Sequence, residues 1–459
     1  MVRLAKRRDE IKCIVNLNTI RWMRENENEG GRSLRKKRES QECSENMENM
    51  EIMEGQIVKP KKKKKHRARN VLIGTAVVVI GLFMFVCCGD SDDSTSSGST
   101  PATVDVEAVK EEMGHFDSGY IMTQLEGDML DNYLAFYDAI YNFRKEFRFP
   151  HPIEDEDEFY ALYLAMWFEC PETFQLDYDD FSTYKDRDTR YITGCQLNYR
   201  MDQDTYQSAL SQCQGIASAL QKQTEGMSDY DKELYVYEYL AENIIYDDSA
   251  ENDSNIYGAL VEGRAVCSGN SQAFKYVCDA VGLPCVGIFS YEDDQEGNGH
   301  AWNAVCLDGN WYDVDLTADT DTVDQPMEGY LTYSALNVPR TWITDTGHPV
   351  TSYYAEYFDL PESNSFDMDY HVVNDEFVAD GEDYAEYFCE GVSRAYENGD
   401  ALVYLQFESD EDYNNFLDQR SDLQQEWLDN YSSSEVYSIG GTYYRDAAYR
   451  TIIFVPEFE

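Results

Sequence analysis

Beyond residue 105 the pattern of apolar and polar positions predicts a folded chain that mixes helices with strands. Between 105 and 225 apolar side chains recur at three- and four-residue steps, which is the spacing of one helix face. The clearest run is Leu130, Tyr133, Leu134, Tyr137 and Tyr141. We therefore expect a mainly helical domain over 105–225, interrupted by a short extended stretch at 191–199.

A second domain is predicted over 226–375. Ser228 is a suitable N-cap for its first helix. A later helix is expected to begin near Cys267, and Gly282 followed by Pro284 should end it, because Gly tolerates positive φ and Pro cannot continue a helix. Strand-like runs follow at 285–291, 300–307 and 311–316.

The last two of these runs flank Asp308-Gly309, a dipeptide that favours a two-residue hairpin turn. With that turn, Leu307 lies opposite Asn310. Farther along, strand-like runs at 402–407 and 449–455 surround a helical pattern at 410–430. Residues 376–459 are therefore predicted to form a small α+β region, and the fold class of the whole chain is α+β.

Residues 71–88 (VLIGTAVVVIGLFMFVCC) carry no charge. As a helix they would span roughly 27 Å, close to the hydrocarbon thickness of a bilayer. A Lys-rich tract precedes them and an acidic, Ser-rich stretch follows, so the positive-inside rule places the N-terminus in the cytoplasm. We expect a single-pass cell-membrane protein with a basic, disordered segment at 1–70, a transmembrane helix at 71–88, a flexible linker at 89–104 and an extracytoplasmic C-terminal part.

Other interpretations of the N-terminus remain open. The true start could be Met47, Met50 or Met53, which would shorten the leader. Cys87 or Cys88 could carry a lipid, although the preceding Phe and Val are larger than the residues such sites prefer. A cleaved signal peptide is disfavoured, because a leader of this length is too long for one.

The charge is distributed very unevenly and argues against nucleic-acid binding. The chain holds 37 Lys and Arg against 88 Asp and Glu, and 20 and 11 of these lie in residues 1–70. That leaves 17 basic and 77 acidic residues in 89–459, a net charge of −60. Such an acidic body repels a phosphate backbone, and it is consistent with a soluble domain or with cationic substrates.

Eight of the 12 cysteines lie beyond the apolar segment. Disulfides are permitted outside the cell, but buried free cysteines are equally consistent with the sequence. There is no CxxC pair, which disfavours a zinc site, and we expect neither a metal nor an organic cofactor.

Cys267 carries the most specific chemistry, because it is predicted to stand at the N-terminus of its helix. Unpaired backbone N–H groups and the positive end of the helix dipole favour a thiolate there. The same N–H groups can bind the oxyanion that forms when a thiolate attacks a carbonyl.

The predicted hairpin brings a histidine close to an aspartate. Strand side chains alternate, so His300 and Asp315 lie diagonally adjacent on one face, about 7 Å apart before their side chains meet. Asp313 falls on the same face, and the spacing alone does not choose between the two carboxylates. A nucleophile, an imidazole and a carboxylate in this arrangement match the logic of thiol acyl transfer.

At these residues the sequence resembles the transglutaminase-like superfamily, whose fold is related to papain-like cysteine proteases. The matching blocks are Tyr257-Gly-Ala-Leu, Cys267-x-Gly269, Gly299-His-Ala-Trp-Asn303 and Trp311-Tyr-x-Val-Asp315-x-Thr317. The resemblance covers roughly 228–320 and implies a papain-like, transglutaminase-like catalytic core within 226–375. It also implies that Cys267, His300 and Asp315 are the catalytic residues, and so favours Asp315 over Asp313.

Two functions follow from the resemblance. The first is a cysteine-dependent hydrolase or acyl transferase that cleaves peptide or amide bonds of a peptide or protein substrate at the cell surface through a thioester. The alternative is an inactive surface module that binds peptides or cell-wall polymer. It is favoured by Asn270 and Ala318, which stand where aromatic residues are common in bacterial members. The substrate and the oligomeric state stay open.

Overall fold

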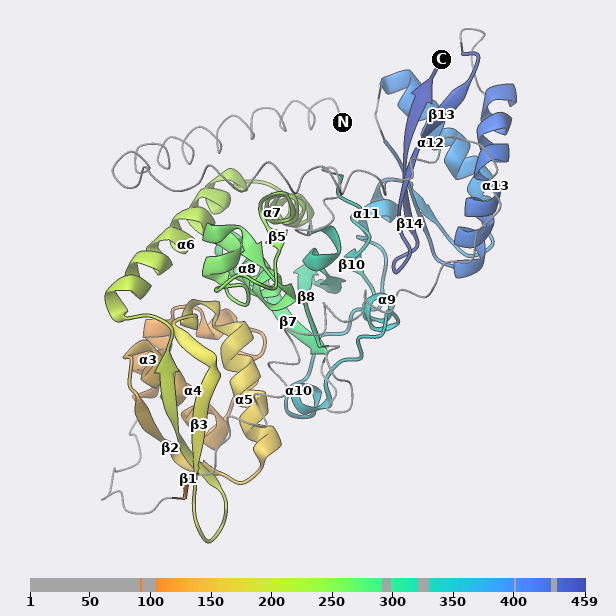
Figure 1. The fold of residues 1–459 in the computed structure, drawn as a ribbon. Helices are drawn as coiled ribbons and strands as arrows, with labels where there is room; N and C mark the ends of the chain where they lie inside the picture. The colour runs from red at the N-terminus through yellow and green to blue at the C-terminus, as the bar shows by residue number, and fades with distance from the viewer. Residues whose placement is uncertain (1–90, 93–104, 291–298, 321–329, 400–401, 431–435) are drawn as a thin grey trace, which may run out of the picture. The chain divides into compact units, whose positions relative to one another are not determined.

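The computed structural model describes residues 91–92, 105–290, 299–320, 330–399, 402–430 and 436–459. All of these belong to one compact unit, 66–459 (Figure 1). The predicted basic segment 1–70 and transmembrane helix 71–88 lie outside the described residues. Among the helices of the described ranges, none is long and apolar enough to cross a bilayer.

The first folded region, which lies within 105–225 apart from one short strand at 91–92, combines four helices with a four-stranded sheet. Its helices are α3 (Val106–Met113), α4 (Gly127–Tyr141), α5 (Glu156–Glu169) and α6 (Gln203–Gln223). Its strands are β1 (Ser91–Asp92), β2 (Glu146–Ile153), β3 (Leu176–Lys185) and β4 (Ile192–Tyr199), in the order β1-β3-β4-β2.

The helices and β4 lie where the sequence predicted them, but the prediction of a mainly helical domain missed β2 and β3. Pro150 and Pro152 interrupt β2, and proline is a poor residue for a central strand. Because β2 is an edge strand that pairs only with β4, the missing N–H groups are tolerated. Of the predicted linker 89–104, the structure describes only Ser91–Asp92, which pair with β3.

The central sheet is antiparallel and lies within 226–375. Its strands are β7 (Cys285–Ser290), β8 (His300–Leu307), β9 (Asn310–Val314) and β10 (Leu336–Val338), in the order β10-β9-β8-β7. The helices that precede it are α7 (Asp229–Asn243), capped by Ser228 as predicted, and α8 (Cys267–Val281). A short parallel pair, β5 (Ile245–Tyr246) and β6 (Arg264–Ala265), leads into α8.

The predicted hairpin register is confirmed. Leu307 pairs with Asn310, and the turn residues Asp308 and Gly309 both have positive φ, at 50° and 86°. This is the conformation of a type I′ turn, whose twist matches that of the flanking strands. The register of β8 on β9 therefore follows from the local turn chemistry.

Helix α8 packs its apolar face against this sheet. Phe274, Val277 and Cys278 are fully buried in one core with Val305 of β8 and Val314 of β9. The helix ends at Gly282, which has a φ of 82°. This left-handed conformation is the glycine stop that the sequence predicted. The packing of α8 determines where its N-terminus stands relative to β8.

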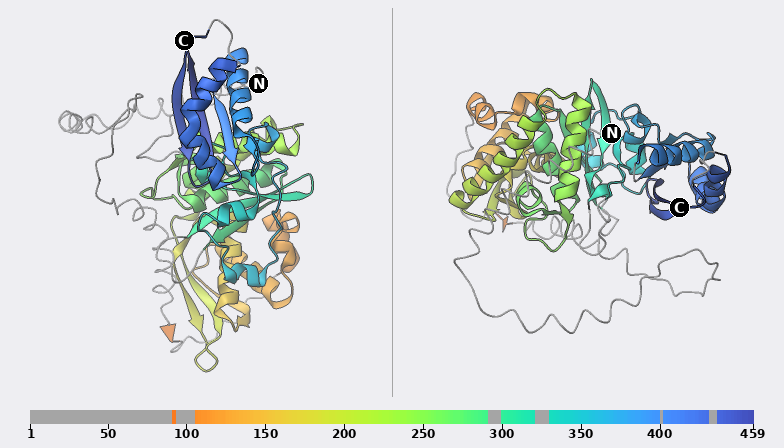
Figure 2. Two further views of the ribbon diagram at one scale, coloured as in Figure 1. Left: turned by 90° about the vertical axis from the view of Figure 1, so that its right-hand side faces the viewer. Right: turned by 90° about the horizontal axis from the view of Figure 1, so that it is seen from above.

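The C-terminal region is an α+β unit, as predicted, with a four-stranded sheet and two long helices (Figures 1 and 2). Its strands are β11 (Phe377–Val378), β12 (Val403–Phe407), β13 (Ile439–Asp446) and β14 (Thr451–Phe458), and its helices are α12 (Tyr384–Asn398) and α13 (Asp410–Asn430). Short helices α9 (Arg340–Thr344), α10 (Ser352–Tyr357) and α11 (Tyr370–Val373) join it to the central sheet.

The C-terminal region contacts the central region through specific polar groups. Ser334 Oγ donates to Asp446 Oδ2 at 3.0 Å, and Gln406 Nε2 donates to the Ser334 carbonyl at 2.9 Å. The Arg450 guanidinium lies over the Trp342 ring, 4.1 Å from its centroid. These contacts link the two regions across the segment that contains β10.

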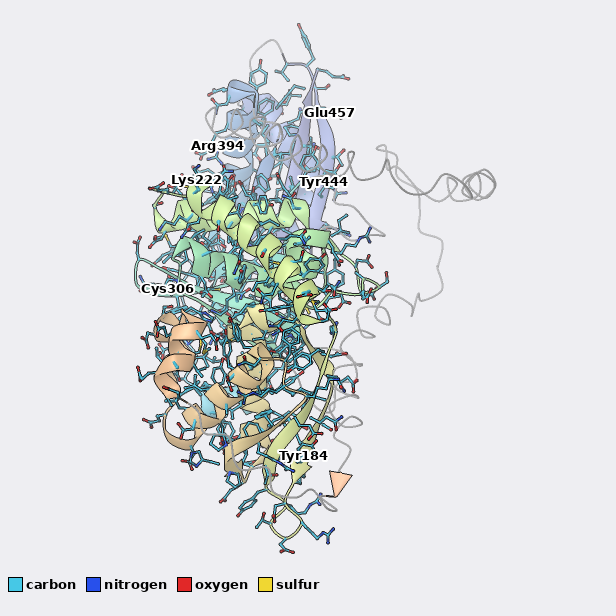
Figure 3. The ribbon with its side chains drawn as sticks, turned by 90° about the vertical axis from the view of Figure 1, so that its left-hand side faces the viewer. Tyr184, Lys222, Cys306, Arg394, Tyr444 and Glu457 are labelled. Atoms are coloured by element: carbon cyan, nitrogen blue, oxygen red, sulfur yellow. The ribbon has the colours of Figure 1, made fainter. Side chains whose placement is uncertain are left out.

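None of the eight described cysteines forms a disulfide bond. Seven are buried and Cys306, labelled in Figure 3, is partly exposed. Among the described residues the sulfur atoms therefore act as single thiols and not as covalent cross-links.

Candidate active site

Cys267 is the first residue of α8, and its side chain is almost completely buried. The preceding Val266 has extended backbone, and its N–H donates to the Asp253 carbonyl at 2.9 Å. A Cβ built on Gly269 would stand 2.2 Å from that same carbonyl oxygen, so only glycine allows this close approach. The Cys-x-Gly spacing thus has a steric cause, and it leaves the first-turn N–H groups of α8 beside the thiol.

His300 and Asp315 meet at the ends of two neighbouring strands. His300 begins β8 and Asp315 directly follows β9, and His300 Nε2 lies 2.7 Å from Asp315 Oδ2. The other carboxylate oxygen of Asp315 accepts from the Thr317 N–H at 3.0 Å. The two side chains are only 12% and 4% exposed, so this contact is shielded from water.

The electrostatics of the pair favour the charged forms. Burial by itself lowers the pKa of His300, but the Asp315 carboxylate, its hydrogen bond and the Cys267 sulfur together raise that pKa well above its usual value. Burial alone would raise the pKa of Asp315, and His300 and the Thr317 N–H outweigh it and lower that pKa. Since Asp315 holds Nε2, the second ring nitrogen, Nδ1, is the one left for Cys267.

Two hydrogen bonds fix α8 to β8 one turn below the thiol. Ser271 Oγ donates to the Trp302 carbonyl at 3.0 Å, and Asn303 Nδ2 donates to the Ser271 carbonyl at 3.1 Å. Ser271 is four residues after Cys267, and Trp302 is two residues after His300. The distance between thiol and imidazole is therefore held by the backbones of both elements.

Asp313, the other carboxylate that the spacing allowed, belongs to a separate contact. It accepts from Trp302 Nε1 at 2.7 Å and from two guanidinium nitrogens of Arg340, each at 3.1 Å. A bidentate arginine pair of this kind is a structural anchor. It leaves Asp315 as the carboxylate beside His300.

Tyr449 is a part of the site that the sequence analysis did not identify. Its hydroxyl donates to Asp315 Oδ2 at 3.2 Å, the same oxygen that contacts His300. Burial raises the pKa of Tyr449 well above its usual value, so the hydroxyl stays a neutral donor. Tyr449 lies 134 positions beyond Asp315, and no local pattern distinguishes it among the 36 tyrosines of the chain.

Asn270 and His348 complete the surroundings. Asn270 is buried and its Nδ2 donates to Thr317 Oγ1 at 3.2 Å and to Thr320 Oγ1 at 3.1 Å, which ties α8 to the turn after Asp315. The His348 ring lies 4.6 Å from the His300 ring. The sequence marked Asn270 only as a departure from the family pattern, and it gave no signal for His348.

Comparison with known proteins finds a family whose model covers the segment that contains Cys267, His300 and Asp315. The family model described as "Transglutaminase-like superfamily" matches residues 204–316, which begins within α6, before the predicted domain start at 226. Kyphoscoliosis peptidase of Mus musculus is 29% identical over 143 residues, covering 28% of this chain and 21% of that protein. The Homo sapiens protein of the same name is 29% identical over 114 residues, covering 22% and 17%.

The chain thus spans about a fifth of the length of the curated relatives it matches. Similar solved structures include a TGase, with 15% identity over 47% of this chain and 56% of that one, at a TM-score of 0.23. The periplasmic domain of TgpA from Pseudomonas aeruginosa has 13% identity over 28% of this chain and 59% of that one, at a TM-score of 0.20. These TM-scores are too low to carry an argument.

Proposed function

Because the chain contains a transglutaminase-like domain of mixed helices and strands, we propose that it is a cysteine-dependent hydrolase or acyl transferase for peptide or amide bonds. Cys267 is the proposed nucleophile, His300 the acid and base, and Asp315 the residue that orients His300. The observation that carries the proposal is the 2.7 Å contact between His300 and Asp315, which leaves the other ring nitrogen for a thiol at a helix N-terminus.

The proposed reaction follows from this arrangement. The Cys267 thiolate attacks the carbonyl carbon, and the first-turn N–H groups of α8 bind the resulting oxyanion. Protonated His300 then gives its proton to the leaving amine as the C–N bond breaks, which leaves a thioester. Water or a second amine attacks the thioester, His300 takes its proton, and the C–S bond breaks to restore the thiolate.

Asp315 has an electrostatic part in this proposal. Its carboxylate keeps Nε2 protonated, so that Nδ1 is the nitrogen that exchanges a proton with the thiol and the substrate. It also stabilises the imidazolium, which agrees with the raised pKa of His300. The raised pKa favours a protonated His300 before substrate binds.

The place of action is part of the same proposal. We place the enzyme at the cell membrane, anchored through 71–88, with its folded part outside the cytoplasm and acting on peptide or protein substrates there. The strongly acidic body supports cationic segments of such substrates as partners, and it argues against nucleic acids. The curated relatives are named as peptidases, which supports cleavage of peptide bonds over cross-linking of proteins.

An inactive binding module remains the second candidate. Asn270 favours it, because bacterial members often have an aromatic residue at this position. Here the position holds a small polar side chain, which is hydrogen-bonded to Thr317 and Thr320. Such a module would keep the fold and the surroundings of Cys267 without needing a reactive thiolate.

The two candidates are separated by iodoacetamide labelling of the full chain at mildly acidic pH, read by peptide mass spectrometry. Cys306 is a matched internal reference, because it is more exposed than Cys267. An activated thiolate predicts that Cys267 reacts on the order of 100-fold faster than Cys306, and that His300→Ala removes the advantage. Equal rates at both cysteines would reject the enzyme and favour the binding module.

A turnover screen completes this test. Peptide hydrolysis and ammonia release are measured with mixed peptides, and Cys267→Ala should reduce any activity by roughly 10⁴-fold or more. Cys213→Ala is the matched control, since Cys213 is another buried thiol but lies on α6 in a separate core. Activity that survives Cys267→Ala would contradict the proposed mechanism.

A further inference from the structure

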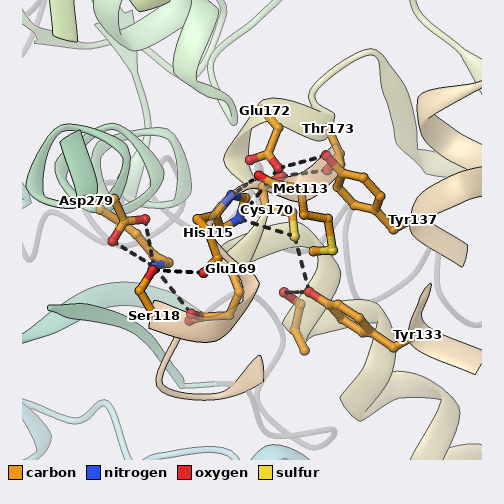
Figure 4. Close-up of polar contacts among 12 residues, drawn as sticks. Met113, His115, Ser118, Tyr133, Tyr137, Glu169, Cys170, Glu172, Thr173 and Asp279 are labelled. Atoms are coloured by element: carbon orange, nitrogen blue, oxygen red, sulfur yellow. Dashed lines mark hydrogen bonds and ion pairs between the residues drawn. The ribbon is translucent and has the colours of Figure 1, made fainter. Parts of the chain in front are cut away.

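A second group of thiol, imidazole and carboxylate lies in the first folded region (Figure 4). His115, Cys170 and Glu172 each present one ligand atom, and these three atoms lie within 4.8 Å of one another. His115 Nε2 is 3.6 Å from Glu172 Oε1 and 4.0 Å from Cys170 Sγ. The three side chains converge on a single point.

The histidine is oriented as metal-binding histidines are. His115 Nδ1 lies 2.7 Å from the Met113 carbonyl oxygen. That oxygen can only accept a hydrogen bond, so Nδ1 carries the proton and the lone pair is on Nε2, which faces Cys170 and Glu172. A histidine held by a backbone carbonyl with its free nitrogen toward other ligands is a recurring feature of metal sites. A lone pair facing a carboxylate oxygen is unfavourable unless a cation or a proton lies between them.

The other two ligands are also held in place. Cys170 is fully buried at the end of α5, and Tyr133 Oη lies 3.2 Å from its sulfur. Tyr137 Oη donates to Glu172 Oε1 at 3.3 Å. His115 and Glu172 are 26% and 16% exposed at their side chains, so the cluster opens toward solvent on one side. That opening gives an entry path and room for a water ligand.

We propose that His115, Cys170 and Glu172 bind one zinc ion, with water as the fourth ligand. Zinc accepts nitrogen, sulfur and oxygen ligands at about 2.0–2.3 Å in tetrahedral geometry, which places ligand atoms roughly 3.3–3.6 Å apart. The two distances from His115 Nε2, 3.6 and 4.0 Å, need to contract by only a few tenths of an ångström, and the Cys170 and Glu172 ligand atoms lie within 4.8 Å of each other. A thiolate and a carboxylate also balance the charge of Zn²⁺, so the buried complex is neutral.

A zinc ion here would revise the expectation that the chain has no zinc site, which rested on the absence of a CxxC pair. His115 precedes a short 3₁₀ helix, Phe116–Ser118, whereas Cys170 and Glu172 come from the end of α5 and the turn after it. A ligand set assembled from segments 55 positions apart has no spacing signature. Only the packing of the segment after α3 against α5 brings it together.

The site would brace the helix that carries Cys267. Glu169, the last residue of α5, lies 3.4 Å from Lys275 Nζ of α8, and both are buried. Lys275 also contacts Asp279 and the Cys285 carbonyl. The ion pair between Glu169 and Lys275 joins the first folded region to α8. Zinc at Cys170 would therefore hold the end of α5, and with it Glu169, in place. This inference does not depend on the proposed catalytic function.

The test is metal titration of the full chain with Co²⁺ and Zn²⁺. It is made in a Cys267→Ala background, so that the thiol of the candidate active site cannot contribute a ligand. One equivalent of Co²⁺ should give a thiolate-to-cobalt charge-transfer band, and Zn²⁺ should abolish it. Cys170→Ser and Glu172→Gln should each weaken zinc binding by about 100-fold or more, since loss of an outer partner alone costs about 10–100-fold.

Two control variants test whether a loss of zinc binding is specific to the proposed ligands. Cys213→Ser replaces another buried thiol, and Glu126→Gln replaces an exposed carboxylate of the same region. Both should bind zinc like the parent. If Cys170→Ser fails to fold, as judged by circular dichroism, the partly exposed Glu172→Gln and His115→Gln carry the test. Absence of a charge-transfer band, or zinc affinity unchanged in Glu172→Gln and His115→Gln, would overturn the proposal.

Discussion

The proposed triad at Cys267 and the cluster at Cys170 contain the same three functional groups in different arrangements. In the triad, His300 stands between its partners, with Nε2 on Asp315 and the other nitrogen left for the thiol. In the cluster, His115 turns one nitrogen to a backbone carbonyl, and its Nε2 faces the thiol and the carboxylate together. The first arrangement is linear and can pass a proton, and the second is convergent and can hold a cation.

The electrostatic environments of the two groups differ as well, and the difference again suits one group to proton transfer and the other to holding a cation. The pKa of His300 is raised and that of Asp315 is lowered, so the surroundings favour the charged forms of this imidazole and this carboxylate. Burial raises the pKa of the Cys170 thiol well above its usual value, and nearby Glu172 adds to the effect. A thiol there stays protonated unless a cation compensates it. The chemistry of such a group therefore depends on the partner of the histidine, which is the Asp315 carboxylate for His300 and the Met113 carbonyl for His115.

The largest expected effect comes from Asp315→Asn. The amide cannot stabilise the imidazolium and favours the wrong tautomer, so we expect kcat/KM to fall by about 10³–10⁴-fold. Zinc affinity, measured in the Cys267→Ala background with and without Asp315→Asn, should stay within roughly twofold, because changes at separate, independent sites do not couple. If zinc binding weakens in parallel with activity, the triad and the cluster are not independent.

Asp313→Asn is the companion variant for this experiment. It keeps the shape of the side chain but leaves the partly buried Arg340, whose side chain is 18% exposed, beside a neutral amide. We therefore expect a loss of about 3 kcal/mol in the free energy of unfolding. Chemical denaturation of both variants separates the two roles. A stable Asp313→Asn protein that has lost activity would mean that the choice between the two carboxylates is wrong.

Another buried carboxylate extends the comparison, because within the described part of the chain no ion pair with a cationic side chain offsets its burial. Glu233 on α7 is fully buried and accepts from Asn337 Nδ2 at 2.6 Å, and burial raises its pKa to about 8. The folded state therefore binds a proton that the unfolded state releases above its ordinary pKa of 4.5. Stability should fall as the pH rises from 4.5 to about 8.

Glu233→Gln removes this titration. The variant should match the parent near pH 4.5 and exceed it in the free energy of unfolding above pH 8. We expect a difference of about 2 kcal/mol or more there, because one pKa unit corresponds to about 1.4 kcal/mol. Urea midpoints across this pH range measure the difference. Glu242→Gln is the control, since Glu242 lies on the same helix and is exposed. A parent whose stability does not fall over this range would contradict the assignment.

The smallest expected effect is that of Tyr449→Phe. Removing one hydrogen bond to Asp315 makes the carboxylate a slightly stronger partner for His300. The same change removes one of the contacts that position the carboxylate. We expect kcat/KM to change by roughly 3–10-fold, about the net worth of one ordinary hydrogen bond, together with a shifted pH profile. Unaltered pH dependence would show that Tyr449 only packs. Tyr444→Phe, a partly exposed tyrosine on β13, is the control.

The sequence predicted those parts of the structure that local chemistry determines. The start of α8 at Cys267, its end at Gly282 and the β8–β9 register follow from a glycine stop and a two-residue turn. The proximity of His300 and Asp315 follows from that register. Their catalytic role stays a prediction.

The features that were missed depend on contacts between distant segments. Gly440 and Gly441 hid β13, because glycine in a strand usually indicates a break. Here the strand is held by pairing with β14 along its whole length. Tyr449 beside Asp315 and His115 beside Cys170 likewise depend on packing between segments with no common pattern. Periodicity and spacing carry no information about such pairs.

The hydroxyl of Tyr449 also has a consequence for the evolution of this architecture. A C-terminal region that supplies a donor to Asp315 cannot be exchanged by recombination as a free module, because its replacement would have to bring a hydroxyl to the same oxygen. The Ser334–Asp446 bond adds a second requirement of the same kind. We therefore expect the two regions to have been inherited together, with substitutions around residue 449 correlated with those in the turn after Asp315.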